Sequence, residues 1–132
     1  MQLNITTDYA IRSLIYIAEK DREVSRRDIC SATKIPENYL YKLMAKFREC
    51  GYVEAVRGID GGYKLIVDPK DISVFDIVTL VEGPININRC ALDGRECSKD
   101  GHGNCKVHAF YVGLQGSIEK TLRKTTLKSL MR

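Results

Sequence analysis

The sequence lacks the features that mark several large functional classes. It contains no apolar run of membrane-spanning length, and its first residues have neither the basic start nor the apolar stretch of a secretory leader. It also has no C-x-x-C pair, no glycine-rich phosphate-binding motif and no cofactor signature. We therefore expect a cytoplasmic protein that is not an enzyme and does not associate with a membrane.

The size and charge of the chain allow one domain and favour an anionic partner only weakly. With 132 residues, 44% of them hydrophobic, the chain can bury one core and carry a small extension. In a reducing compartment its five cysteines are expected to be ligands or buried thiols rather than disulfides. The net charge of +4 suits nucleic acid, but a solvated lysine-rich surface would produce the same value.

Two helix starts are readable near the beginning of the chain. Thr7 is the expected N-cap of a first helix, which carries a regular apolar face and runs to about Lys20. The segment that begins at Ser25 has the form of a capping box, so it predicts a short second helix. Cys30 lies on the apolar side of that helix and is expected in the core.

A third helix followed by a β-hairpin predicts a winged helix-turn-helix. Pro36 suits the first turn of the third helix, and Gly51 suits its C′ position. The positions expected to pack against the first two helices include Tyr39, Leu40 and Leu43. Strand-like runs at residues 52–56 and 63–67 then flank a glycine-rich turn. A β-hairpin directly after a recognition helix is typical of a wing.

The second half of the chain predicts a long helix that joins two copies of the protein. Ser73 opens a short helix with a second capping box, and Gly83 closes it. Residues 106–123 then carry a narrow apolar stripe, formed by Val107, Phe110, Leu114, Ile118 and Leu122. Such a stripe favours pairing with the same helix of a second chain in a homodimer. The alternative is a helix folded back onto its own domain.

These elements define a mainly α protein with a small β-hairpin: a winged helix-turn-helix domain plus a long dimerisation helix. We expect the DNA-binding domain at residues 1–70 and a linking helix and turn at 71–89. A cysteine-rich loop is expected at residues 90–105, and the dimerisation helix with a C-terminal segment at 106–132.

Three cysteines in the loop at residues 90–105 indicate a metal or iron–sulfur site. Cys90, Cys97 and Cys105 are separated by polar, glycine-rich residues that offer little to a hydrophobic core, and His108 follows. The spacing C-x6-C-x7-C-x2-H is looser than the paired C-x2-C of zinc ribbons and suits a bulky cluster better than one small ion. The alternatives are thiols without a ligand, a disulfide-bonded hairpin, or a structural zinc site closed by the histidine.

The third helix carries the residues expected to read DNA. The N-terminal part of a recognition helix enters the major groove, so Asn38, Tyr41 and Lys42 are the residues expected to reach base edges. Lys46 and Arg48 lie farther along the helix and are expected to contact phosphates or to form a solvated face. The expected partner is double-stranded DNA with a palindromic operator.

The turn of the hairpin carries the other expected DNA contacts. Arg57 is placed to enter a minor groove narrowed by A·T pairs, where the negative potential is enhanced. Gly58, Gly61 and Gly62 would let the backbone approach the DNA closely. Glycines also occur in hairpins without a function, so the arginine is the more informative residue.

Together these segments resemble the IscR/NsrR family of bacterial winged-helix regulators nearly end to end. The matching segments are Thr7-Asp8-Tyr9-Ala10-Ile11-Arg12, Ile35-Pro36 with Tyr39-Leu40 and Lys42-Leu43, Arg57-Gly58 with Gly61-Gly62-Tyr63 and Leu65, Val81-Glu82-Gly83-Pro84, and the three-cysteine loop. The resemblance implies that a [2Fe-2S] or [4Fe-4S] cluster, held by Cys90, Cys97 and Cys105, controls operator binding. Relatives that repress cysteine metabolism without a cluster generally lack the three-cysteine loop.

The chain departs from the family pattern at the cluster ligands. The intervals between its cysteines are one or two residues longer than those usual in the family, so the cluster type stays open. His108 matches the fourth ligand of the IscR branch, whereas Asp8 matches an acidic residue that reaches the partner subunit's cluster in the NsrR branch. The alternatives are an ordinary first-turn histidine and an aspartate that interacts only with the helix dipole. His102, between two glycines, is expected to be a solvated loop residue.

Overall fold

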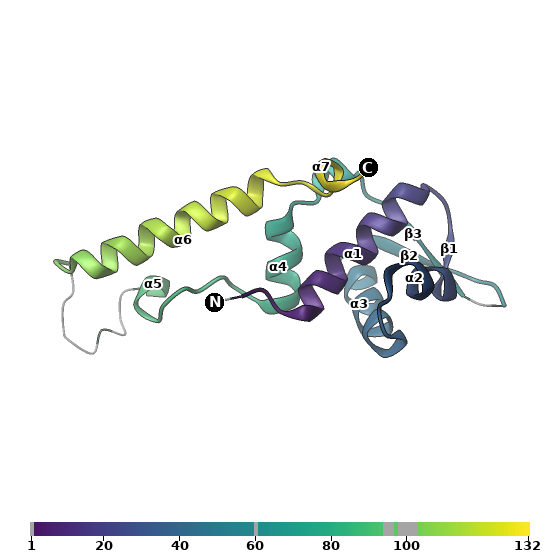
Figure 1. Ribbon diagram of the computed structural model, residues 1–132, viewed down its shortest axis with the longest axis horizontal. Coiled ribbons are helices and arrows are strands. Elements are labelled where there is room, and N and C mark those ends of the chain that lie inside the picture. The colour runs from purple at the N-terminus through teal and green to yellow at the C-terminus, as the bar shows by residue number, and fades with distance from the viewer. Residues whose placement is uncertain (1, 60, 94–96, 98–102) are drawn as a thin grey trace.

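The computed structural model describes residues 2–59, 61–93, 97 and 103–132 of the chain. Its helices and strands are α1 (Ile5–Lys20), β1 (Val24–Ser25), α2 (Arg26–Thr33), α3 (Glu37–Glu49), β2 (Val53–Val56), β3 (Gly62–Leu65), the 3₁₀ turn η1 (Pro69–Asp71), α4 (Val74–Glu82), α5 (Cys90–Asp93), α6 (Lys106–Lys124) and α7 (Leu127–Leu130). In Figure 1, α1 to β3 gather at one end of an elongated molecule, and α6 extends away toward the other end. His102 lies outside the described residues.

The local signals for helix starts were correct at two helices and wrong at one. The Ser25 and Ser73 side chains cap α2 and α4, and the reciprocal capping box at Ser73 is complete. In α1, however, the N-cap is Asn4, whose side chain accepts a hydrogen bond from a backbone amide of the first turn. Thr7 is instead buried inside the helix, and its hydroxyl donates to Oε1 of Glu82 at 2.5 Å. Asparagine and threonine both cap helices well, so tertiary contact decided which one does so here.

The predicted recognition helix is present as α3, but Pro36 is its N-cap residue, one position before the first turn in which it was expected. Leu40 and Leu43 are fully buried, as expected, because they face α1 and α2. Tyr39 packs against α1 through an edge-on contact with Tyr9, with ring centroids 5.3 Å apart, but it keeps 36% of its surface exposed. Gly51 follows the helix at φ +83°, a conformation that glycine adopts without steric cost.

The hairpin belongs to a three-stranded antiparallel sheet with the order β1-β3-β2. The register of β2 and β3 runs from Val53 opposite Leu65 to Val56 opposite Gly62. The strand β1 was not predicted, because two residues are too short to show an alternating pattern. The pairing of β1 with β3 also explains why residue 62 is a glycine, because a Cβ at Gly62 would lie 2.7 Å from the carbonyl oxygen of Val24.

The end of the chain returns to the winged-helix core, which the sequence did not predict. Leu127 of α7 is fully buried, and α7 packs against η1 and α1. Next to it, the Val74 amide donates to the Thr125 carbonyl, and the Leu127 amide donates to the Ile72 carbonyl, each at 2.8 Å. These bonds fix the C-terminal end of α6 to the start of α4.

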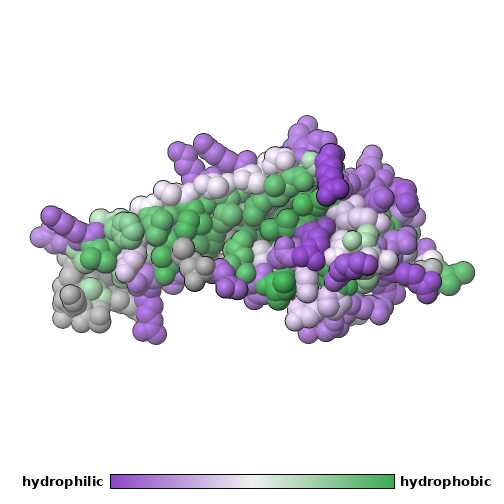
Figure 2. Space-filling model, in the orientation of Figure 1, coloured by the Kyte–Doolittle hydropathy of each residue, from purple (hydrophilic) through white to green (hydrophobic). Residues whose placement is uncertain are grey.

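The long helix α6 is only partly covered by its own chain. No residue of α6, which the structure describes in full, is buried. Near α4, the Arg123 guanidinium lies 3.4 Å from the centre of the Phe75 ring, whereas Val107 and Phe110 near the other end are 55% and 62% exposed. Figure 2 shows an apolar band that follows α6 along the visible face. Within the described ranges, no helix is long and apolar enough to cross a membrane.

Candidate functional site

The exposed side of α3 presents the residues that the sequence analysis assigned to DNA. Asn38, Tyr41, Lys42 and Lys46 are all exposed, because the opposite side of the helix is anchored in the core. Asn38, Lys42 and Lys46 recur every four residues and so lie along one side of the helix, and Tyr41 lies three residues after Asn38. The left-handed Lys34, at φ +61°, ends α2 and turns the chain toward α3. This arrangement suits a recognition helix, and the DNA contacts themselves stay a prediction.

Two arginines beside the recognition helix were missed by sequence reasoning. Arg26 and Arg27 form the first turn of α2, and with Cys30 and Glu37 they line a groove of 320 Å³ where α2 meets the start of α3. Arginines at the positive end of a helix suit phosphate groups. The signal was present in the sequence, since both arginines directly follow the capping serine.

The turn of the wing is closed by its own glycines and braced by α2. The Gly61 amide donates to the Gly58 carbonyl at 3.2 Å, and Gly61 has φ +59°. The Arg26 amide donates to the Gly61 carbonyl at 3.3 Å, and a Cβ at Gly61 would lie 3.0 Å from the Arg26 guanidinium. Arg57 stays exposed beside this turn. The wing is therefore held against α2 with its arginine available to a partner.

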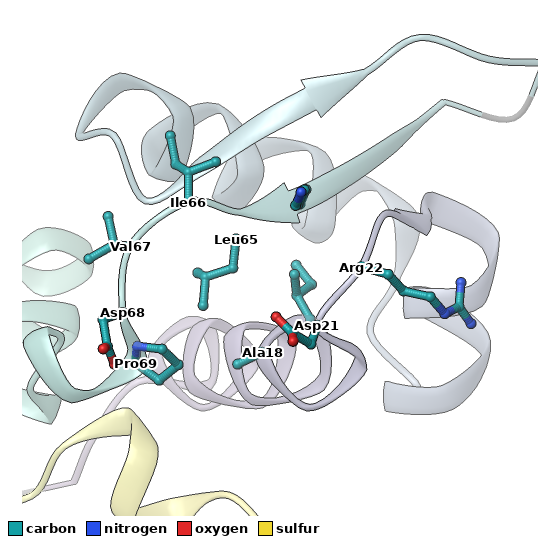
Figure 3. Close-up of a pocket in the computed structure, with 10 residues that line it drawn as sticks. Ala18, Asp21, Arg22, Leu65, Ile66, Val67, Asp68 and Pro69 are labelled. Atoms are coloured by element: carbon teal, nitrogen blue, oxygen red, sulfur yellow. The ribbon is translucent and has the colours of Figure 1, made fainter.

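Another groove lies between the end of α1 and the segment after β3. It has a volume of 520 Å³ and combines acidic and basic side chains, Asp21, Arg22, Lys64 and Asp68, with apolar ones (Figure 3). No cysteine or histidine is among the described residues that line it.

Both ends of the cysteine loop are in contact with α6. The Ile87 amide donates to the Gln115 side chain of α6 at 3.2 Å, and the Cys90 amide donates to the Asn88 side chain at 3.4 Å. The short helix α5, which starts at Cys90, also packs on α6. This helix was not predicted. At the other end of the loop, Cys105 is the N-cap residue of α6.

The structure brings some of the proposed ligands to one place but not all of them. Cys105 and His108 occupy the N-cap and third positions of α6, which share one end of the helix, and both are partly buried. Cys90 and Cys97 are also partly buried, and none of the five cysteines, all of which the structure describes, forms a disulfide. Among the described residues, no three His, Cys, Asp or Glu side chains converge to hold a metal ion.

Asp8 is linked to the helix-turn-helix through an arginine. It forms an ion pair with Arg12 one turn farther along α1, and Arg12 also donates to the carbonyl of Thr33 at 2.9 Å. The Arg12 guanidinium lies 5.4 Å from the centre of the Tyr9 ring, which contacts Tyr39 of α3. The carboxylate of Asp8 is therefore connected to the end of α2 and, through the aromatic pair, to the recognition helix.

The two cysteines outside the loop are poor candidates for ligands. Burial raises the pKa of the Cys30 thiol, and the nearby Glu37 carboxylate adds to the rise while Arg26 opposes it. Burial also raises the pKa of Cys50, although hydrogen bonds with the backbone partly offset it. A raised pKa keeps a thiol protonated, whereas metals bind the thiolate.

Comparison with known proteins identifies relatives along the whole chain. Residues 3–132 match the Rrf2 family, described as "Iron-dependent Transcriptional regulator". The chain is 38% identical to the transcriptional regulator NsrR of Bacillus subtilis (strain 168), over 100% of this chain and 91% of that protein. Among solved structures, T. potens IscR has 26% identity and a TM-score of 0.76, with 98% of this chain and 85% of that one covered. The oxidised form of Staphylococcus aureus CymR has the same identity and TM-score and covers 98% and 95%.

Proposed function

The chain belongs to the Rrf2 family of transcriptional regulators, and on this premise we propose that an iron–sulfur cluster in its cysteine loop controls its binding to DNA as a homodimer. Regulators of this family bind DNA and are not enzymes. NsrR and IscR are among the relatives, so the finer assignment is to a cluster-dependent sensor of iron–sulfur status, redox state or nitric oxide.

The observation that carries the proposal is the position of the cysteines relative to α6. Cys90 starts the helix that packs on α6, and Cys105 is the N-cap residue of α6 itself. Three thiols and an imidazole within one short segment have the donor chemistry that iron–sulfur clusters require. A group bound there would join the loop to α6, whose other end is hydrogen-bonded to the start of α4. An ordered loop would therefore constrain the position of the winged-helix core, because α6 connects the two.

The same helix supplies the surface for the homodimer. Val107 and Phe110 are exposed near the N-terminal end of α6, and they continue the apolar stripe through Leu114 and Ile118. Pairing two copies of α6 would hold two recognition helices at a defined separation. A palindromic operator needs that separation to match about one turn of DNA, roughly 34 Å. A change of a few kcal/mol between two separations is sufficient to switch operator occupancy.

Anaerobic purification followed by an absorption spectrum and assays of iron, sulfide and zinc tests this proposal directly. The expected result is visible absorption with iron and sulfide in comparable amounts. Protein that has lost its iron and sulfide should have a different affinity for DNA. Colourless protein with one zinc per chain and unchanged affinity would instead make the site structural.

We expect Arg57→Ala to weaken DNA binding most on operators with A·T-rich flanks, by about 1–3 kcal/mol, because the side chain would enter a narrowed minor groove. The measurement is a salt series of titrations with a palindrome selected by the wild-type protein, its version with G·C flanks, and a scrambled duplex. Equal losses on all three, with a shallower salt slope, would reassign Arg57 to a phosphate contact.

Substitutions in α3 are the matched comparison for that experiment. Lys42→Ala or Asn38→Ala should reduce the difference in affinity between the selected palindrome and a mutated palindrome, because base contacts specify the sequence. A recognition-helix variant that keeps full discrimination would contradict the assignment of these residues to base edges.

For the fourth ligand, we expect His108→Ala to shift the visible spectrum and to shorten the lifetime of the chromophore in air. His108 shares one helix end with Cys105, whereas the carboxylate of Asp8 is already paired with Arg12. Asp8→Asn is the matched comparison, because it removes the charge and preserves the shape. A larger shift in Asp8→Asn would assign the ligand to the partner chain, and no shift in either variant would leave the fourth position to water or a small molecule.

A further inference from the structure

The tip of the wing carries an apolar side chain that the fold does not use. Ile59 is 106% exposed, which is the highest value among the large hydrophobic side chains of the described residues, and Tyr41 follows at 63%. In Figure 2 the wing ends in an apolar tip that projects from an otherwise polar end of the molecule. The side chain of Ile59 thus contributes nothing to the hydrophobic core.

The turn itself does not require isoleucine. The hydrogen bond from the Gly61 amide to the Gly58 carbonyl makes Ile59 the second residue of a four-residue turn. Proline is favoured at that position, and polar residues with glycine dominate such turns, because they form them with little strain. A β-branched apolar residue there stabilises neither the turn nor the core, so its contribution requires a surface outside the free protein.

The surroundings of Ile59 indicate which surface that is. Two residues earlier in the chain lies the exposed Arg57, and at most about 7 Å of chain separates two positions that far apart. The hydrogen bond from the Arg26 amide to the Gly61 carbonyl holds the turn against the start of α2, and Arg26 also lines the groove where α2 meets the start of the recognition helix. A wing placed so that Arg57 enters a minor groove would carry Ile59 into the same groove. The walls of that groove are lined by deoxyribose C–H groups, which an apolar side chain can contact.

We propose that Ile59 is a specificity-determining residue that packs into the minor groove at the flanks of the operator. The inference rests on the proposed binding of palindromic DNA. A groove narrowed by A·T pairs would surround the side chain on both sides, whereas the exocyclic amino group of guanine would obstruct it. Ile59 would therefore favour A·T-rich flanks through shape and apolar contact, with no hydrogen bond to a base.

The test compares three duplexes that share one palindrome, selected by the wild-type protein from a random pool. Their flanks are A·T, G·C or inosine·C pairs, and inosine lacks the amino group that guanine places in the minor groove. The wild-type protein should prefer A·T and inosine·C flanks over G·C flanks. Ile59→Ser should lose about fivefold to twentyfold in affinity on the first two and little on the third.

Two features separate this role from an ionic contact and from a general defect. Ile59→Ser changes no charge, so the dependence of affinity on salt should keep its wild-type slope, whereas the loss of a phosphate contact would reduce the slope by about one. Ile66→Ser is the matched control, because Ile66 is a 50% exposed isoleucine that lines the groove beside α1 instead of the wing. It should bind all three duplexes as the wild-type protein does.

Three outcomes would overturn the inference. Wild-type affinity of Ile59→Ser on every flank would remove any role in binding, and an equal loss on all flanks would remove the role in specificity. Unchanged DNA binding with lost regulation in a transcription assay would assign the side chain to a protein partner. A wild-type protein that selects no palindrome would instead contradict the proposed function itself, so the two failures are distinguishable.

Discussion

Cys97→Ala should abolish the visible chromophore and the bound iron and sulfide, while the protein stays folded and dimeric. Cys97 belongs to a loop that is outside the winged-helix core and outside the apolar stripe of α6. Removing one of three thiolates leaves too few protein ligands for a stable cluster. The measurements are the absorption spectrum, iron and sulfide content, thermal unfolding and size-exclusion chromatography of protein purified without oxygen.

The other two cysteines provide matched controls for this substitution. Cys30→Ala and Cys50→Ala remove the same thiol, but both residues lie in the winged-helix part of the chain and have pKa values raised by burial. Both variants should keep the chromophore. Stoichiometric loss of iron from either one would contradict the ligand assignment, and an unfolded or aggregated Cys97→Ala protein would mean that this cysteine is structural.

The parts of the fold that were predictable are those whose signal is local. The capping box at Ser73 and the glycine after the recognition helix depend on a few neighbouring residues, and both were correct. The order of the helices and the hairpin followed from apolar periodicity and from the turn residues. The distinction between Asn4 and Thr7 as N-cap was not local, because Glu82 binds the threonine hydroxyl from a distant helix.

The unpredicted parts depend on contacts between segments far apart in the sequence. In the sequence, Leu127 is only part of the expected C-terminal segment, and its position beside η1 and α1 is what makes it a core residue. Similarly, Arg26 contacts the turn at Gly61 because the fold places the start of α2 beside the wing, and the spacing of residues in the sequence does not show this. For the candidate site, the residue types and spacing indicated the donors Cys105 and His108. The hydrogen bond from the Ile87 amide to the Gln115 side chain, which holds the segment before Cys90 against α6, could not be predicted from the sequence.

Phe110→Asp should convert the homodimer into a monomer and reduce affinity for a palindromic duplex by about a hundredfold to ten-thousandfold. Phe110 is 62% exposed on the apolar stripe of α6, so its replacement costs the isolated chain little. A carboxylate there would have to lose its water when two copies of α6 pack together. A monomer binds only one half-site, and the gain from joining two binding modules disappears. Sedimentation equilibrium and titration of the selected duplex measure the two effects.

Val112→Asp is the matched control, because it introduces the same charge at another exposed apolar residue of the same helix. Two residues along an α-helix are separated by about 200°, which places Val112 away from Phe110 and outside the stripe. This variant should stay dimeric and bind the duplex normally. If both variants are monomeric, a charge at any exposed apolar position of α6 is sufficient to separate the subunits, and the stripe does not define the interface. If both stay dimeric, another surface joins the subunits and must also set the separation of the two recognition helices.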